Sequence, residues 1–167
     1  MRSDNKRIER LIIALEKHKD DRGVMADLKR GFSDSTADRT WPYLSKWGCD
    51  IVNDRERIIY QTVSAAYAVT KGCSTDKDNY NIGTVCRQLA IGDGRGDKKL
   101  KTFEARFRRL LTCSSVDEIS GHLTGIIRAA AAKNIAINFK RLFKDLWYYS
   151  DNVKLEWASE YWKVEEP

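Results

Sequence analysis

The sequence is short of the features that mark membrane and secreted proteins. Among its 167 residues are only two prolines, and no uninterrupted apolar run is longer than that of residues 11–15, which is far below the ~18 residues of a membrane helix. The first ten residues, MRSDNKRIER, are charged and lack the apolar segment of a secretory signal. With 42% hydrophobic and 32% charged residues, the composition is that of a globular chain. We therefore expect a cytoplasmic protein with no membrane contact.

Metal and disulfide chemistry has little support. The four cysteines are scattered without a C-x-x-C pair, and neither histidine stands at a metal-ligand offset from one of them. In a cytoplasmic protein such cysteines are usually reduced, small apolar core residues. We therefore expect no zinc site, no other metal site and no disulfide.

Sequence motifs of enzymes are also missing. The glycines of GDGRG, residues 92–96, follow no strand and lack the G-K-[ST] ending of a phosphate-binding loop. The motifs G-x-S-x-G and H-E-x-x-H are absent, and the adjacent acidic pairs at 20–21 and 117–118 point in different directions on a helix. We expect no enzyme and no cofactor.

Helical spacing of apolar residues recurs along the chain, and no alternating strand pattern does. Helices are predicted over 8–15, 24–28, 58–67, 82–89, 103–111, 116–133 and 138–149, with a short helix that has Pro42 in its first turn and a final helix capped at Ser150 or Asp151. Asp54 is expected to cap the helix over 58–67, Gly31 to end that over 24–28 and Gly48 to end the short helix. The predicted fold class is all-α, a compact helical bundle forming one small domain over residues 1–167. A turn-rich connector near 73–81 could divide it into two helical lobes.

One predicted helix combines an apolar stripe with a cluster of arginines. In FEARFRRLL, residues 103–111, the apolar residues at helical spacing face one core, while Arg106, Arg108 and Arg109 are left for water or a partner. Arg106 and Arg109 are three residues apart and share one helix face, whereas Arg108 points away and reads more simply as a solvated charge. The planar fork of donors in arginine suits phosphate oxygens.

Basic residues are unevenly distributed along the chain. Residues 87–144 hold thirteen Lys/Arg and five Asp/Glu, a local net charge of +8, whereas the whole chain carries +6, so the remainder sums to −2. Any single arginine reads more simply as structural, but the collective excess indicates contacts with a nucleic-acid backbone, without sequence readout. The candidate residues are Lys29, Arg30, Arg55, Arg87, Lys98, Lys99, Lys101, Arg106, Arg109, Arg128, Arg141 and Lys144.

Aromatic residues gather in the C-terminal quarter of the sequence. Trp157, Tyr161 and Trp162 are candidates for a protein interface, where tryptophan and tyrosine are enriched. In a helical protein such residues belong more often to the core or to a subunit interface than to a base-stacking surface.

The order of several short segments resembles that of the CasB family, the small subunit of the type I-E CRISPR surveillance complex, Cascade. The segments are RGVMADLKRG, RTWPYLSKWG, NIGTVCRQLA, FEARFRRLL, INFKRLFKDLWYYSDN and EWASEYW, which span about residues 20–162. The resemblance implies an all-α protein without enzymatic activity, present as two copies in contact with each other. It implies as partners the backbone and large subunits of Cascade, the crRNA and the target DNA.

The resemblance also implies a role in antiviral defence, in which the subunit steadies the guide–target heteroduplex and the displaced strand of the R-loop. The basic residues that fall in the matching segments are Lys29, Arg30, Arg87, Arg106, Arg108, Arg109, Arg128, Arg141 and Lys144, whereas Lys98, Lys99 and Lys101 rest on charge alone. An alternative stays open, a helical protein–protein scaffold whose basic face docks on acidic partner surfaces. A small helical nuclease, the third class, has no metal-ligand cluster to support it.

Overall fold

The protein is built from α-helices joined by short connectors. The computed structural model describes residues 2–92 and 97–164, without the side chains of 97–100 and 102. The elements are α1 (Arg2–Lys17), α2 (Arg22–Lys29), η1 (Arg30–Phe32), η2 (Ala37–Arg39), α3 (Trp41–Lys46), α4 (Asp54–Val69), α5 (Ile82–Ile91), α6 (Asp97–Thr112), α7 (Val116–Ala132), α8 (Phe139–Trp147) and α9 (Asp151–Tyr161). Within these described ranges there is no strand, only an isolated bridge between Ser74 and Ile137. The all-α prediction is confirmed.

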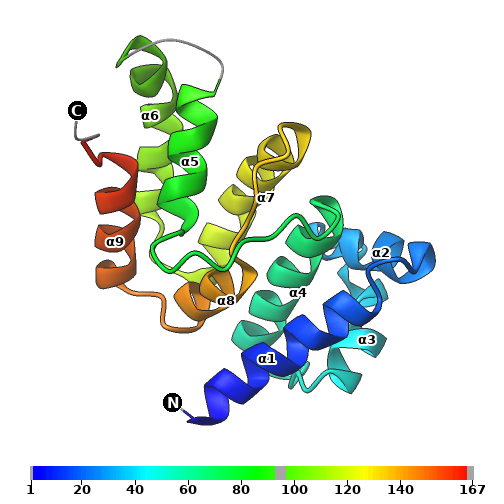
Figure 1. Ribbon diagram of the computed structural model, residues 1–167. Coiled ribbons are helices and arrows are strands. Elements are labelled where there is room, and N and C mark those ends of the chain that lie inside the picture. The colour runs from blue at the N-terminus through cyan, green and yellow to red at the C-terminus, as the bar shows by residue number, and fades with distance from the viewer. Residues whose placement is uncertain (1, 93–96, 165–167) are drawn as a thin grey trace.

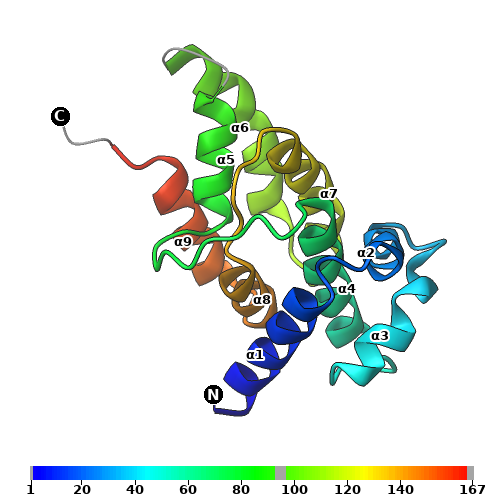
Figure 2. The ribbon, with the colours of Figure 1, turned by 45° about the vertical axis from the view of Figure 1, so that its right-hand side comes forward.

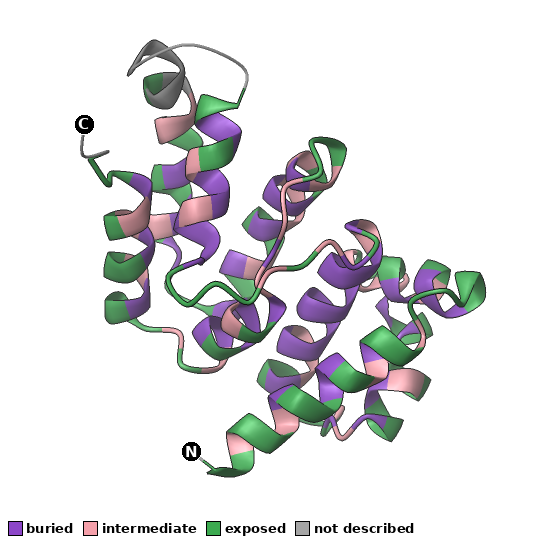
Figure 3. Cartoon of the chain, in the orientation of Figure 1, coloured by how far each residue is buried: buried purple, intermediate pink, exposed green. Residues whose placement is uncertain are grey.

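The helices are arranged on two sides of a central group (Figures 1 and 2). The first three helices lie on one side of α4, while α5, α6 and α9 lie together on the other, with α7 and α8 between. Helix α4 packs against α2, α7 and α8, and α5 packs against α6 and α9. Every residue from Tyr60 to Ala68 in α4 is buried, as Figure 3 shows by the nearly continuous purple of this helix. A helix that is buried on all sides lies at the centre of the bundle.

A single cluster of buried apolar side chains runs through both sides of the molecule. Three of the cysteines, Cys49, Cys86 and Cys113, are buried, and all four are free thiols. Burial raises the pKa of the Cys49 thiol to about 12 and also raises the pKa of Cys86, so neither forms a reactive thiolate at neutral pH. In the described ranges, no helix is long and apolar enough to cross a membrane.

Two predicted helix ends differ from the structure. The cap of α4 is Asn53, whose side-chain oxygen accepts a hydrogen bond from the Glu56 N–H at 3.0 Å, and Asp54 is already in the first turn. Gly31 does not end α2 in a left-handed conformation but lies in the 3-10 turn η1. An added Cβ there would lie 3.0 Å from the Gln61 carbonyl oxygen of α4, so this glycine permits close packing. Gly48, with φ of +97°, ends α3 as predicted.

The connector between α4 and α5 contacts the connector between α7 and α8. Thr75 N–H donates to the Ile137 carbonyl at 3.1 Å, and Ile137 N–H donates to the Cys73 carbonyl at 3.0 Å. A lobe boundary at 73–81 remains a prediction.

Candidate nucleic-acid interface

Helix α6 holds its arginines on a buried apolar stripe. Phe107 and Leu110 are fully buried, so they fix the orientation of the helix. Arg106 and Arg109 are exposed on the surface that this packing leaves free. Arg108, in contrast, pairs with Glu104 at 2.7 Å, and its guanidinium lies 5.0 Å from the Trp162 ring centroid. Arg108 therefore has partners within the chain, whereas the sequence suggested a plain solvated charge.

Arg106 lies at the contact between α6 and α7. Its guanidinium carbon is 5.6 Å from the Phe103 ring centroid, and its Nη2 would lie 2.6 Å from a Cβ placed on Gly125 of α7. A guanidinium over an aromatic ring is stabilised by the ring quadrupole. The side chain is thus held between one turn of α6 and the backbone of α7.

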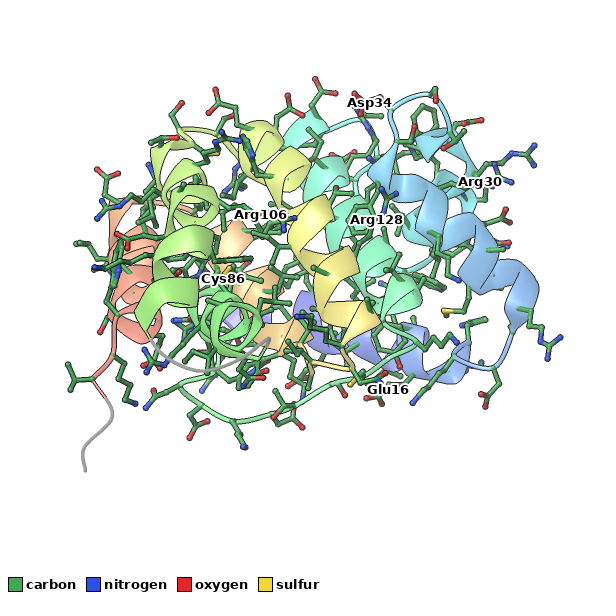
Figure 4. The ribbon with its side chains drawn as sticks, turned by 90° about the horizontal axis from the view of Figure 1, so that it is seen from above. Glu16, Arg30, Asp34, Cys86, Arg106 and Arg128 are labelled. Atoms are coloured by element: carbon green, nitrogen blue, oxygen red, sulfur yellow. The ribbon has the colours of Figure 1, made fainter. Side chains whose placement is uncertain are left out.

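Two further arginines continue this surface toward the N-terminal side of the molecule. Arg128 follows Gly125 by three residues on α7, and its guanidinium carbon is 5.9 Å from the Phe32 ring centroid of η1. Arg30 begins η1, two residues before Phe32, and is exposed. We call Arg106, Arg128 and Arg30 the arginine row, and Figure 4 labels all three across one face of the helices.

The arginine row differs from an ordinary ion-paired surface. Among the described residues, none of its guanidinium groups has a carboxylate at salt-bridge distance, and the same holds for Arg109. The charges are therefore available to an external anion. An acidic cavity of about 400 Å³, lined by Phe32, Asp34, Asp117, Glu118 and His122 among others, adjoins the row at Phe32. The carboxylates of this cavity would repel a polyanion there.

Three of the predicted contact residues have internal acceptors instead. Arg55 donates to the Leu146 carbonyl at 3.1 Å and to that of Trp147, at the C-terminal end of α8. Arg87 donates to the Tyr161 carbonyl at 3.0 Å. Arg141 bonds to Asp145 at 2.7 Å and pairs with Glu156 of α9. These guanidinium groups connect helices within the chain, so we leave them out of the candidate interface.

The remaining predicted lysines are dispersed. Lys29 ends α2, Lys101 lies in α6 and Lys144 lies in α8, and all three are exposed. The side chains of Lys98 and Lys99 lie outside the described residues. Lys29 immediately precedes Arg30, and Lys144 lines a cavity with Arg141 on the α8 surface.

The predicted protein interface at Trp157 and Tyr161 is wrong, because both side chains are fully buried in the core of the chain. Trp157 Nε1 donates to Asp145 at 2.8 Å, and Tyr161 stacks on Phe107 with centroids 4.0 Å apart. Trp162 is 37% exposed and packs edge-on against the same phenylalanine. The spacing of Val153, Trp157 and Tyr161 at i, i+4 and i+8 is the sequence signal for a core stripe.

A larger cavity lies against α5, and none of its lining residues belongs to the arginine row. It has a volume of about 1250 Å³, and residues of α5, the α7–α8 connector and the end of α9 line it. Arg87, Lys133 and Lys163 bring positive charge to this cavity, Glu160 pairs with Lys163 at 3.9 Å, and the exposed Ile91 adds apolar surface. No group of three or more His, Cys, Asp or Glu among the described residues is placed to hold a metal ion.

Solved structures share this fold. A CRISPR-associated protein of the Cse2 family from Thermus thermophilus has a TM-score of 0.71 at 22% identity, with 94% of this chain and 98% of that chain covered. A chain of a CRISPR RNA-guided surveillance complex has a TM-score of 0.73 at 19% identity, with 95% and 92% covered. CasB from Thermobifida fusca has a TM-score of 0.65 at 13% identity, with 95% and 96% covered.

The sequence comparison with protein families agrees with the shared fold, while no curated protein matches. The model of the family described as CRISPR-associated protein Cse2 matches residues 24–162, which is most of the chain. The resemblance to CasB is thereby confirmed. The chain belongs to the Cse2 family of CRISPR-associated proteins, which includes CasB.

Proposed function

We propose that this chain is a non-catalytic subunit of the type I-E Cascade complex, where it binds nucleic-acid backbone without sequence specificity. In this role it stabilises the crRNA–target heteroduplex and the displaced strand of the R-loop in antiviral defence. Membership of the Cse2 family and the likeness to a chain of a CRISPR RNA-guided surveillance complex support this proposal. We extend it to two copies of the chain in contact within the complex, beside the backbone and large subunits.

The arginine row is the observation that carries the proposal. Its guanidinium groups come from three elements, are backed by phenylalanine rings in two cases, and have no carboxylate partner among the described residues. Phosphate contacts of this kind position a protein on nucleic acid without reading bases. R-loop formation is a nearly balanced exchange of duplexes, so a few backbone contacts are enough to favour it.

Charge reversal on α6 tests the proposal. Arg106→Glu/Arg109→Glu in the reconstituted complex should weaken target-DNA binding at least tenfold, about 1.4 kcal/mol, while the complex still assembles. Binding by the isolated chain should fall steeply as salt rises, because each neutralised phosphate releases counterions. Wild-type affinity in the double variant would refute the proposal.

The matched control is Lys17→Glu/Lys19→Glu, which changes the net charge by the same amount at two exposed positions, the last residue of α1 and the turn that follows it. Glu16, next to these lysines, is labelled in Figure 4 near the lower edge of the molecule, below Arg106 and Arg128. If both double variants lose binding equally, the effect belongs to net charge and not to contacts of Arg106 and Arg109.

The cavity on α5 favours a second candidate function, a scaffold that docks on an acidic protein surface. Its described lining holds Arg87, Lys133 and Lys163 against the single carboxylate Glu160, and this excess of positive charge beside the exposed Ile91 would suit an acidic segment that also carries an apolar residue. Ile91→Glu/Lys163→Glu should then prevent incorporation of the chain into the complex. If the variant assembles normally, the scaffold function does not reside in this cavity.

A further inference from the structure

Helix α7 contains two glycines whose surroundings differ sharply. Glycine is among the least favourable residues in a helix interior, so each position calls for a reason. At Gly121 an added Cβ would meet no atom within 4 Å, whereas at Gly125 it would meet Arg106 Nη2 at 2.6 Å. Gly125 is therefore in contact with a residue of the candidate interface, and Gly121 is not.

The space that Gly125 leaves is occupied by the arginine itself. The Arg106 guanidinium rests near the Phe103 ring on α6 and against the α7 backbone at Gly125. Arg128 is three residues further along α7 and so lies on the same side of that helix. A methyl group at position 125 would push the Arg106 guanidinium away from α7 and from the neighbourhood of Arg128.

We propose that Gly125 is a positioning residue of the nucleic-acid interface. Its missing side chain lets Arg106 lie across α7, so that Arg106 and Arg128 face the same nucleic-acid backbone. This inference rests on the proposed function. A long side chain that is already held in its binding geometry loses less rotamer freedom on binding, and this preorganisation increases affinity.

The obstacle at position 125 is the far end of a flexible side chain, not backbone. Gly125→Ala can therefore be accommodated by movement of Arg106 alone, and alanine favours the helix more than glycine does. The melting temperature of Gly125→Ala should be equal to that of the wild type or higher. Its target-DNA affinity, in contrast, should fall about fivefold, which corresponds to the loss of one preorganised side chain.

The test compares four variants in the reconstituted complex: Gly125→Ala, Gly121→Ala, Arg106→Ala and the double variant Gly125→Ala/Arg106→Ala. Target-DNA affinity is measured at several salt concentrations, and the melting temperature of each chain is recorded. Gly121→Ala is the matched control and should bind as the wild type does. In the Arg106→Ala background, Gly125→Ala should cause no further loss, because the two substitutions act through the same side chain.

The outcomes separate this inference from the proposed function. If Arg106→Ala weakens binding and Gly125→Ala does not, the positioning role is overturned while the proposed function stands. A loss in Gly125→Ala that persists in the Arg106→Ala background, or that accompanies a lower melting temperature, indicates a structural role and also overturns it. If Arg106→Ala binds target DNA as tightly as the wild type does, Arg106 makes no contact with nucleic acid. That result contradicts the proposed function, and the positioning role of Gly125 is overturned with it.

Discussion

Two helix contacts, α5 with α9 and α6 with α7, each depend on a glycine but differ in what that glycine faces. At Gly83 of α5 an added Cβ would fall on the Trp157 carbonyl group, 2.7 Å from its carbon atom. At Gly125 of α7 the corresponding neighbour is the end of the Arg106 side chain. The first contact is between backbones and cannot adjust, whereas the second holds a flexible charged group that other molecules can reach.

Arg141 and Arg106 differ in a similar way, because one is bound within the chain and the other is not. Arg141 pairs with Asp145 of its own helix, which is 3% exposed, and joins α8 to α9 through Glu156. Arg106 meets an aromatic ring and a glycine, and no carboxylate among the described residues. A guanidinium that is paired within the chain contributes to the structure, whereas an unpaired exposed one is available to bind nucleic acid. The net charge of a segment therefore overstates how many of its arginines belong to the nucleic-acid interface.

The largest effect is expected at the backbone contact. Gly83→Ala should destabilise the chain by about 3 kcal/mol, the upper end for overpacking in a core, because neither backbone can move away. Urea denaturation measures this change. Gly121→Ala is the control and should be neutral or slightly stabilising. Equal stability of Gly83→Ala and the wild type would mean that α5 and α9 can separate without loss.

The next effect concerns the ion pair between Arg141 and Asp145 within α8. Arg141→Ala leaves the Asp145 carboxylate buried with Trp157 as its remaining donor. Removing one partner of a fully buried pair costs ~3–5 kcal/mol, and we expect about 2 kcal/mol here because Arg141 retains some solvent contact. Urea denaturation at neutral pH measures it.

The pH dependence of this variant follows from Asp145. Burial raises the pKa of the Asp145 carboxyl above its ordinary value, while hydrogen bonds from Trp157 and Arg141 oppose that shift. Without Arg141 the pKa rises further. A group whose pKa is raised in the folded state stabilises the fold as pH falls through that pKa. The destabilisation of Arg141→Ala should therefore diminish from neutral toward acidic pH, and a pH-independent loss would contradict the burial argument.

Much of the fold is predictable because the apolar stripes are long and regular. The stripe of α6 and that of α8 indicate both the helices and their buried faces. The caps are less predictable, because Asn53 and Asp54 are adjacent and both favour the position, and only the hydrogen bond to Glu56 N–H distinguishes them. The role of Gly31 is close packing on α4, which no local pattern records.

The candidate interface is less predictable than the fold, because the ion-pair partner of a charged side chain often comes from another helix and is not visible in the local sequence. The pairing of Arg141 with Asp145 at i+4 is visible in the sequence, but that with Glu156 depends on how α9 packs. The composition of the C-terminal segment favours an interface for Trp157, although Asp145 and the core enclose it. The role of Gly125 depends on a neighbour nineteen positions away in the sequence.

A smaller effect is expected in the middle of the arginine row. Arg128→Ala removes one exposed guanidinium that lies over Phe32, so target-DNA affinity should fall about fivefold. The slope of log affinity against log salt concentration should also become shallower by the amount expected for about one phosphate contact. Binding titrations at several salt concentrations measure both. Lys17→Ala removes one charge elsewhere and should leave the salt dependence unchanged. If the two variants behave alike, Arg128 contacts no phosphate.

The smallest effect is expected at Arg108, which allows a paired and an unpaired arginine to be compared within α6. Arg108 is in the same turn as Arg106 and Arg109, yet it pairs with Glu104 and stacks on Trp162. Arg108→Ala should change target-DNA affinity less than twofold, since its charge is already neutralised, and should cost about 0.3 kcal/mol of stability, as for exposed i,i+4 pairs. The same binding titration and urea denaturation check both values. A loss as large as that of Arg106→Ala would show that nucleic acid displaces Glu104, and the distinction between paired and unpaired arginines would then no longer predict which of them bind.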